Sequence, residues 1–450
     1  MLKYKVLRCL FVLVCLRGLI VSMSERYGLV NNGLVVFDDS TGLIEDVRRW
    51  DERDLVKCDL VEGDEHSIVM PGLINTHTHA PMLLLQGLGA DLTGFDWLRR
   101  IWCVEGLLKP EHIYLSAKAS MLLMLENGIT AFADHYFYEE EVAKAAEELG
   151  VRGVLAKSVI EYSEHAPKHT IEESVSFATN YNRVASDRIR TMIGVHAMYS
   201  CSTETLLKAV ESSEKYGIRI HMHFSESLHE LEYIKSKYGV TPTSLARRLG
   251  ILETKPLLAH ATYLSDEDIK TLSKNEVYVT YSPFTIMSWG QDIARVSELI
   301  EGGVTVSLAT DGPVTDGDLS LFKQMKLAIA AQSSRYRMPT KLHPKEVLEM
   351  VTKKAAKSLG IADLVGVLEP GKKADIVVLK PPKTRVVGLY DDPYTTIVYN
   401  LGDESVSDVY VDGRKKISDK APLGIDLENL REKLTDTRIE LLSEAAICGK

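Results

Sequence analysis

The sequence has no closely spaced pair of cysteines. Its six cysteines are scattered along 450 residues without a CxxC motif. This spacing argues against a disulfide framework and against a zinc ribbon, and it fits a protein kept in a reducing cytosol. The chain also lacks an excess of basic residues, because its formal net charge is −10 at pH 7. A nucleic-acid partner is therefore not expected, and the acidity favours solubility.

The N-terminal apolar run is too short to span a membrane. It reads CLFVLVCL over residues 9–16, after a charged start that is typical of a secretory signal. Arg17 interrupts it, however, and no small-residue cleavage site follows. We therefore predict a strand at the start of a folded domain, or an extended start of the chain, in a cytoplasmic protein without a membrane partner. Secretion is the alternative, and a mature chain beginning near Ser22 would support it.

Low-complexity linkers and short-period solenoid repeats are also missing, which argues against a string of small domains. What repeats between residues 69 and 375 is a short apolar run rich in β-branched residues, a polar residue at its end, and then a helical stretch such as 139–150 or 265–274. This alternation is typical of a parallel sheet. The pattern predicts eight strands, at residues 72–79, 129–135, 153–160, 191–197, 218–224, 256–260, 277–282 and 304–311. Eight strands indicate an α/β fold of the closed (β/α)8 barrel type.

Two β-rich pieces, one near each end of the chain, flank the predicted barrel. Neither buries a core alone, but together they can form one small sheet domain. We predict a small β-sandwich domain from residues 1–68 and 375–420, a metal-dependent catalytic barrel over residues 69–374, and a C-terminal helical extension over residues 421–450. The extension has helical apolar spacing and a charged face, so it is expected to pack on the surface.

Two histidines stand two positions apart in PGLINTHTHAPM, at residues 71–82. Alternate side chains of a strand point to the same face, so His77 and His79 can converge on one point. Zinc commonly binds imidazole nitrogens, and a chelating pair is one explanation of the motif. The other explanation is two unrelated histidines beside a turn, so a metal site needs further ligands.

Further polar groups follow other predicted strands, at the end where the functional face of such a barrel lies. They are His196 after the fourth strand, His221 and His223 in the fifth, His260 in the sixth and Asp311 in the eighth. A single histidine near a strand end is more often structural, but several at the same end favour a metal site. His223 lies nearer the strand end and is the preferred ligand, whereas His221 is expected to pack one layer below.

Together these residues resemble the amidohydrolase superfamily, and within it the adenosine-type deaminases that act on S-adenosylhomocysteine and 5'-methylthioadenosine. The resemblance runs from about Arg17 to residue 417. It is carried by PGLINTHTHAPM, WLRRIWCVEG, GITAFADHYFYEEEVAKAAEELGVRG, IGVHAMYS, HMHFSES, LLAHATYL, LATDG and LEPGKKADIVVL. The first fifteen residues and the C-terminal helix lie outside it.

The resemblance implies one divalent metal ion, with zinc expected and iron as the alternative. Its ligands would be His77, His79, His223 and Asp311. His260 would bind the metal or lie beside its water. Relatives with two metals usually carry a bridging lysine at the end of the fourth strand, where this chain has His196, so a single metal is expected.

The chemistry implied is that of a deaminase. A zinc-bound water has a pKa of about 7, so hydroxide is available to attack the amine-bearing carbon of a purine and release ammonia. Asp311 would take the water proton, Glu226 would pass protons to the ring nitrogen and the departing amine, and His260 would orient the hydroxide. Glu226 also has a structural explanation, because it precedes a predicted helix whose N-terminus favours an acid.

The resemblance further implies that Trp102, Glu105 and His196 contact the substrate together with Glu226. The tryptophan would stack on the base and Glu105 would bind sugar hydroxyls. Trp102 and Glu105 are equally well explained by packing and by a solvated charge. Three other residues are assigned structural roles: His135, His229 and Asp96.

Two loops depart from the family pattern. Relatives typically carry H/N-P-x-S-N-M-K-L after the seventh strand, where this chain reads YSPFTIMSWG with Tyr281 and Ile286 in place of polar residues. The segment TDGPVTDGDLS also lacks the usual asparagine. Because these loops would line the pocket mouth, the alternatives are a hydrolase of another heterocycle (a guanine or triazine type deaminase or chlorohydrolase, or a cyclic amidase) and a non-catalytic metal-binding homologue. The predicted partner is a small molecule, and relatives are often homo-oligomers.

Overall fold

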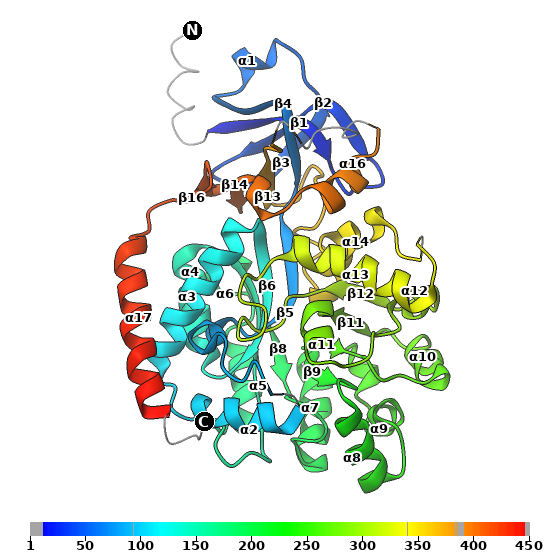
Figure 1. The fold of residues 1–450 in the computed structure, drawn as a ribbon. Coiled ribbons are helices and arrows are strands. Elements are labelled where there is room, and N and C mark those ends of the chain that lie inside the picture. Colours follow the sequence, from blue (N-terminus) through cyan, green and yellow to red (C-terminus); the bar gives the residue numbers. More distant parts are fainter. Residues whose placement is uncertain (1–11, 93, 340, 383, 385–390, 446–450) are drawn as a thin grey trace. The chain divides into compact units, whose positions relative to one another are not determined.

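Eight parallel strands form the centre of the larger part of this protein in a computed structural model (Figure 1). The structure describes residues 12–92, 94–339, 341–382, 384 and 391–445. Each strand pairs with the next along the chain, in the order β5(Leu73–Thr78), β6(Ile129–Tyr136), β7(Arg152–Lys157), β8(Ile189–Gly194), β9(Ile220–Phe224), β10(Leu257–His260), β11(Tyr278–Tyr281) and β12(Thr305–Leu308). All eight predicted strands are present, and the predicted α/β barrel is confirmed.

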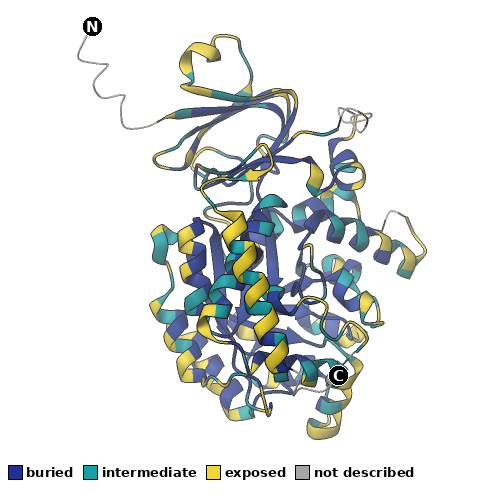
Figure 2. Ribbon diagram, turned by 60° about the vertical axis from the view of Figure 1, so that its left-hand side comes forward, coloured by how far each residue is buried: buried dark blue, intermediate teal, exposed yellow. Residues whose placement is uncertain are grey.

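Hydrogen bonds bring the first and last strands of this sheet together. The Asp311 backbone N–H donates to the carbonyl of His77 over 3.1 Å, and the Thr76 hydroxyl donates to the carbonyl of Leu308 over 2.9 Å. The strands are buried on both faces, as the dark blue ribbons of Figure 2 show. Double burial explains why they appear in the sequence as nearly continuous apolar runs.

Helices follow the strands and cover the barrel. In the order of the chain they are η1(Ala80–Leu85), α2(Gly94–Glu105), α3(Pro110–Glu126), α4(Glu139–Leu149), α5(Ile171–Asn180), α6(Val184–Asp187), α7(Thr203–Tyr216), α8(Leu228–Tyr238), α9(Pro242–Arg248), η2(Leu252–Thr254), α10(Asp266–Leu272), α11(Pro283–Ser288), α12(Val296–Glu301) and α13(Leu321–Tyr336). The predicted helices at 139–150 and 265–274 are α4 and α10. Ser265 begins α10 with a capping box, in which its side chain accepts from the Asp268 N–H and the Asp268 carboxylate accepts from the Ser265 N–H.

The C-terminal helix α17(Leu427–Glu444) is mostly exposed, as predicted (Figure 2). Leu441 is its buried residue. Arg438 extends from the helix and donates to the backbone carbonyls of Leu84 and Gln86, at 2.8 Å for Gln86. Within the described residues no helix combines the length and the apolar character needed to cross a membrane.

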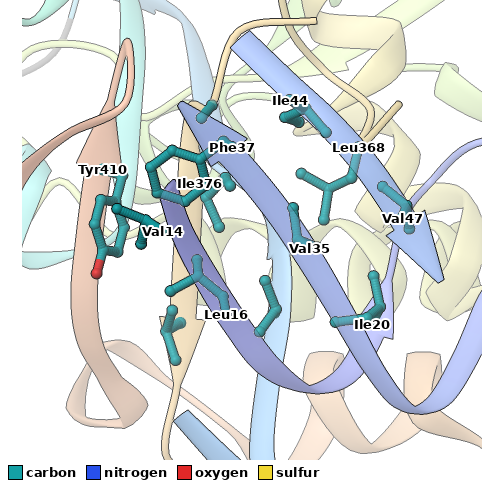
Figure 3. Close-up of a cluster of buried hydrophobic side chains, with 13 residues drawn as sticks. Val14, Leu16, Ile20, Val35, Phe37, Ile44, Val47, Leu368, Ile376 and Tyr410 are labelled. Atoms are coloured by element: carbon teal, nitrogen blue, oxygen red, sulfur yellow. The ribbon is translucent and has the colours of Figure 1, made fainter. Parts of the chain in front are cut away.

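A second sheet combines strands from both ends of the chain, as predicted. Its order is β16(Ala421–Pro422), β15(Arg414–Ser418), β14(Val406–Val411), β13(Ile376–Leu379), β4(Leu60–Pro71), β1(Leu13–Val21), β2(Leu29–Asp38) and β3(Leu43–Arg49). The predicted N-terminal strand is therefore β1. A core cluster on this sheet includes Leu16, Val35, Phe37 and Ile376, and the ring of Tyr410 packs edge-on against Phe37 (Figure 3).

The two end regions of the chain that supply this second sheet also contain shorter helices. They are α1(Asp54–Lys57), α14(Pro344–Met350), α15(Lys353–Leu359), α16(Pro393–Thr395), η4(Thr396–Asn400) and η5(Asp403–Ser405). Residues group into two compact units. One contains the chain up to Ile74, Met124–Thr130 and Pro344–Ile425, and the other contains Asn75–Leu123, Ala131–His343 and the chain from Asp426. The domain boundaries at residues 68, 374 and 420 stay predictions.

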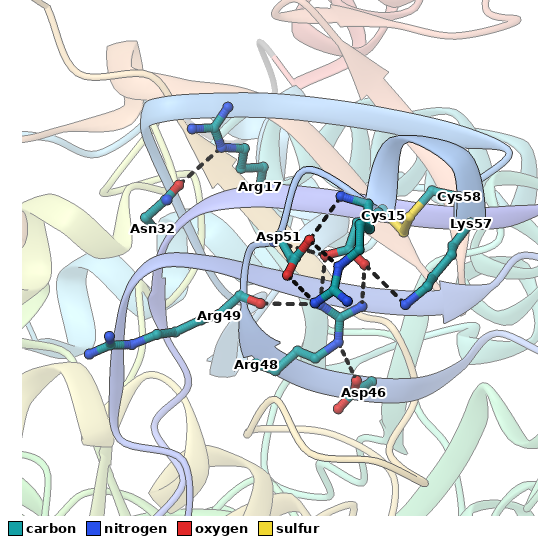
Figure 4. A network of polar contacts seen from close by, with 11 residues as sticks. Cys15, Arg17, Asn32, Asp46, Arg48, Arg49, Asp51, Lys57 and Cys58 are labelled. Atoms are coloured by element: carbon teal, nitrogen blue, oxygen red, sulfur yellow. Dashed lines mark hydrogen bonds and ion pairs between the residues drawn. A yellow bond between two sulfur atoms is a disulfide. The ribbon is translucent and has the colours of Figure 1, made fainter.

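A disulfide joins Cys15 of β1 to Cys58, which follows α1, with their Cα atoms 6.0 Å apart (Figure 4). The expectation of cysteines without disulfides is wrong at this pair. Their separation of 43 residues gives no local signal, and they meet because β1 pairs in parallel with the start of β4. Cys103 is also disulfide-bonded, whereas Cys201 is a free, buried thiol.

Ion pairs next to the disulfide hold the segment that carries Cys58. Arg48 donates to both carboxylate oxygens of Asp54, over 2.7 and 2.9 Å, and to Asp46 over 2.7 Å (Figure 4). The Arg48 guanidinium is the largest influence on Asp54 and holds the pKa of this carboxyl below its usual value. The disulfide and the ion pairs therefore restrain the same short segment.

Replacing Cys58 by serine should lower the free energy of unfolding by about 2–4 kcal/mol, because the unfolded chain loses the constraint of a long closed loop. Chemical denaturation of wild type and Cys58→Ser, followed by circular dichroism, measures the change. The difference should disappear when both proteins are unfolded with a strong reductant. Equal midpoints without reductant would show that this bond adds no stability.

Candidate metal centre and active site

The candidate metal ligands lie at the carboxyl ends of the barrel strands. His77 is in β5 and His79 comes directly after it, His223 is in β9, and Asp311 follows β12. His260 ends β10. Catalytic residues of (β/α)8 barrels lie at this end of the strands, and these five side chains are gathered there from four separate segments of the chain.

Hydrogen bonds orient three of the imidazoles. The Nδ1 atom of His79 donates to the carbonyl of His135 over 2.7 Å, and the Nδ1 atom of His223 donates to the carbonyl of His196 over 3.0 Å. Nδ1 of His77 contacts Nε2 of His221 at 2.9 Å. A carbonyl only accepts, so the first two contacts place the proton on Nδ1 and leave Nε2 with its lone pair, as in many metal-binding histidines.

The Nε2 atoms of His77 and His79 lie near one carboxylate oxygen, and the Nε2 atom of His223 lies near that of His79. Nε2 of His79 lies 3.2 Å from Nε2 of His223 and 3.3 Å from Oδ1 of Asp311. Nε2 of His77 lies 3.6 Å from the same oxygen. Two nitrogen lone pairs and a carboxylate this close repel one another unless a positive charge lies between them.

The electrostatics of His79 reflect this need for positive charge. Burial alone would lower its pKa, but the hydrogen bond and the negative charge of Asp311 raise the pKa to about 9. The site therefore stabilises a cation at this nitrogen. For His77, by contrast, burial and the neighbouring imidazoles hold the pKa well below its usual value, so this ring is a neutral nitrogen donor.

The donor set fits a divalent metal of the zinc type, which binds imidazole nitrogen and carboxylate oxygen. His77, His79 and Asp311 offer atoms within 4.8 Å of one another, and so do His77, His223 and His260. Nε2 of His77 is buried and makes no hydrogen bond within the described residues. The residues present therefore fit the metal that the sequence predicts.

Glu226 and His260 form a pair beside the metal ligands. Oε1 of Glu226 lies 3.5 Å from Nε2 of His260. Burial is the largest influence on Glu226, and with repulsion from Asp311 it raises the pKa of this carboxyl to about 8. A raised pKa suits Glu226 to the donation of a proton at neutral pH.

The backbone is strained at the strand ends that carry these side chains. His260 has a φ of +78° and Asp311 a φ of +64°, and Ser225, directly before Glu226, has a φ of +49°. Residues other than glycine rarely adopt such angles. This kind of strain persists where the surrounding structure enforces it and is common in active sites.

A cavity opens next to the histidines, with about 980 Å³ of space between its atoms, part of it open to solvent. Its lining includes the predicted substrate residues Trp102, Glu105, His196 and Glu226. The ring of Trp102 lies edge-on to His196, with centroids 5.8 Å apart. Burial raises the pKa of Glu105 to about 7 and lowers that of His196 to about 3.

The residues assigned structural roles differ in whether they line the cavity. Asp96 is exposed and pairs with Arg99. His135 and His229, however, both line the cavity. His221 is fully buried and, through its contact with His77, lies behind that ring as expected.

Several further cavity residues were not among the predicted site residues. They are Trp97, Tyr136, Tyr199, Glu230 and Trp289. Tyr136 donates to Oε1 of Glu105 over 2.7 Å, and it ends β6 directly after His135. Trp289 lies in YSPFTIMSWG, the segment that departs from the family pattern and is expected to line the pocket mouth.

The barrel, with a histidine-rich candidate metal site at the carboxyl ends of its strands, is typical of metal-dependent hydrolases of the α/β-barrel class. The amidohydrolase family model matches residues 68–416. The chain belongs to the amidohydrolase family.

Curated relatives resemble most of the chain. One, from Desulforudis audaxviator, is a 5-methylthioadenosine/S-adenosylhomocysteine deaminase, 38% identical over 350 residues, which are 78% of this chain and 79% of the relative. Another, a 5'-deoxyadenosine deaminase from Methanosarcina acetivorans, is 35% identical over 428 residues, covering 95% of this chain and 97% of the relative. In fold, the chain is similar to an adenosine deaminase from Xanthomonas campestris crystallised with zinc, with a TM-score of 0.89 and 23% identity, over 96% of this chain and 98% of the other.

Proposed function

We propose that this protein hydrolyses the amino group of an adenosine-like compound and releases ammonia and the inosine analogue. It is a hydrolase acting on C–N bonds, as the family and the curated deaminases indicate. The observation that carries the proposal is the approach of the His77 and His79 Nε2 atoms to Asp311, with Nε2 of His223 3.2 Å from that of His79 and the Glu226–His260 pair beside them.

Within this proposal, His77, His79, His223 and Asp311 hold one metal ion, for which we propose zinc, with iron as the alternative. When bound, the cation supplies the positive charge that brings the pKa of an attacking water toward about 7. The oriented imidazoles support the assignment, because each has its Nδ1 engaged. His196 at the end of the fourth strand, in place of a bridging lysine, favours a single ion.

The two carboxyl groups divide the proton transfers. Asp311 accepts a proton from the water as a C–O bond forms at the amine-bearing carbon, and Glu226 donates its proton to the adjacent ring nitrogen. The C–N bond then breaks, and the amine leaves as ammonia with the proton that Asp311 took. The proton of the new hydroxyl group returns to Glu226, which restores both acids. His260, 3.5 Å from Glu226, orients the attacking oxygen.

Three residues are proposed to bind the rest of the substrate. Trp102 would stack on the base, Glu105 would bind sugar hydroxyls, and His196 would also contact the substrate. Their burial and their place on the cavity wall support this. Tyr136 fixes one Glu105 oxygen by its hydrogen bond, which leaves the orientation of this carboxyl well defined.

A substrate panel tests the proposal. Zinc-loaded protein should release ammonia from at least one of adenosine, 5'-deoxyadenosine, 5'-methylthioadenosine and S-adenosylhomocysteine, with the loss of adenine absorbance that accompanies formation of the inosine analogue. Release of chloride from a chlorotriazine, or of a ring-opened acid from a cyclic amide, would instead select the alternative hydrolases. No turnover of any of these compounds by the metal-loaded protein would favour the non-catalytic homologue.

We also propose that the protein is located in the cytoplasm and that it forms a homo-oligomer. The scattered spacing of the cysteines supports the cytoplasm, while the disulfide bonding of Cys15, Cys58 and Cys103 opposes it, since such bonds are rare in reducing compartments. Thiol labelling of the protein in freshly lysed native cells distinguishes the two. Unlabelled Cys15 and Cys58 would contradict a reducing compartment.

A further inference from the structure

Helix α2 forms one long wall of the cavity. Trp97, Leu98, Ile101, Trp102 and Glu105 all line it, and their spacing places them on one face of the helix. Eight residues separate Trp97 from Glu105, which corresponds to about 12 Å along the helix axis. Trp102 and Glu105 are buried, whereas Trp97 is half-buried. The helix therefore runs from the inner end of the cavity toward its mouth.

The inner end of this wall lies next to metal-site residues, and its outer end packs against a second tryptophan. Trp102 packs on His196, and Tyr136, which bonds Glu105, lies 6.1 Å from the His79 ring, measured between centroids. Trp97 instead packs against Trp289, which follows α11, with centroids 4.9 Å apart and ring planes 52° apart. Both rings line the cavity and are half-buried. They form an aromatic subsite remote from the reacting groups.

The charge of the cavity also limits what this subsite accepts. None of the described residues that line the cavity is a lysine or an arginine. Four carboxyl groups line it instead: Glu105, Glu226, Glu230 and Asp311. A ligand carboxylate placed here loses hydration without gaining a guanidinium or ammonium partner. The faces of tryptophan rings attract an ammonium group. The amino-acid end of S-adenosylhomocysteine, however, carries a carboxylate beside its ammonium group.

On the basis of the proposed function, we propose that Trp97 and Trp289 bind the 5' substituent of the substrate and select an uncharged, apolar group. With the base at the metal site and the sugar bound by Glu105, this aromatic pair is the part of the cavity wall left for the 5' substituent. A methylthio group suits it, because thioether sulfur contacts aromatic rings favourably. The charged amino-acid end of S-adenosylhomocysteine does not suit it.

Steady-state kinetics with 5'-methylthioadenosine, adenosine and S-adenosylhomocysteine test this assignment. In wild type, kcat/KM for S-adenosylhomocysteine should be at least about ten-fold below that for 5'-methylthioadenosine. Trp289→Ala and Trp97→Ala should raise KM for 5'-methylthioadenosine about ten-fold and leave its kcat nearly unchanged, because the lost contact is remote from the reacting carbon. Adenosine, whose 5' group is a hydroxyl, should be affected less.

Two further variants sharpen the test. Trp289→Lys adds a cation at the subsite and should raise the ratio of kcat/KM for S-adenosylhomocysteine to that for 5'-methylthioadenosine about ten-fold. Trp50→Ala removes a half-buried tryptophan that directly follows β3 and should leave the ratio unchanged. Unchanged metal content and circular dichroism establish that each variant is folded.

The outcomes separate the subsite from the proposed function. Turnover of S-adenosylhomocysteine as efficient as that of 5'-methylthioadenosine, or a ratio that neither tryptophan variant changes, would overturn the subsite and leave the deaminase standing. Absence of ammonia from every adenosine-like compound would overturn both.

Discussion

Replacing Glu226 by glutamine should lower kcat by about 10²–10⁴-fold, the usual contribution of a general acid or base. Glutamine keeps the size of the side chain but cannot supply a proton to the ring nitrogen. The neutral glutamine should also leave the metal ligands in place. The measurement is single-turnover ammonia release at saturating substrate, together with metal content per chain.

The structural explanation of Glu226 predicts a different result. If the acid only favours the N-terminus of α8, Glu226→Gln should lower stability by about 0.3–1 kcal/mol and leave kcat almost unchanged. Glu232→Gln, at an exposed position of the same helix, is the matched control and should retain full activity. Near wild-type kcat in Glu226→Gln would remove Glu226 from the mechanism.

Replacing Asp311 by asparagine should weaken metal binding by more than about 100-fold. Residues that only hydrogen-bond to a metal ligand already contribute about 10–100-fold to metal affinity, and a direct ligand contributes more. Asparagine keeps the shape and can still accept the 2.8 Å hydrogen bond from the Gly312 N–H. It removes the negative charge that His77 and His79 face. Equilibrium dialysis against zinc measures the affinity of wild type and variant.

The two proposed roles of Asp311 can be separated in the same variant. Excess zinc should restore metal occupancy of Asp311→Asn but not its rate, since the amide cannot accept the water proton. Asp266→Asn, at an exposed position, controls for the loss of one carboxylate. Recovery of full activity with metal would limit Asp311 to binding the ion, and unchanged affinity would exclude it as a ligand.

The barrel could be predicted from the sequence because its signals are local. Each strand is buried on both faces, so the runs that begin at Ile129 and Leu257 are mostly apolar, and the helices between the strands have clear starts such as Ser265. The candidate ligands could be chosen because polar groups at the ends of parallel strands share one face of a barrel. The topology alone places His77, His223 and Asp311 near one another.

Contacts that depend on tertiary packing were not accessible in this way. Cys15 and Cys58 pair because two strands lie in parallel register, which no spacing rule reveals. Trp97 and Trp289 are far apart in the sequence, and each alone appears as an ordinary packing residue. No spacing rule links Tyr136 to Glu105, because their hydrogen bond depends on how α2 lies against β6.

The most direct measurement of the central claim is anomalous diffraction at the metal absorption edge from a crystal grown with zinc. The account predicts one strong peak per chain, bonded to Nε2 of His77, His79 and His223 and to the Asp311 carboxylate. A peak held instead by His79, His135 and His223, whose nitrogens also lie within 4.8 Å of one another, would contradict it. So would the absence of any peak at these residues.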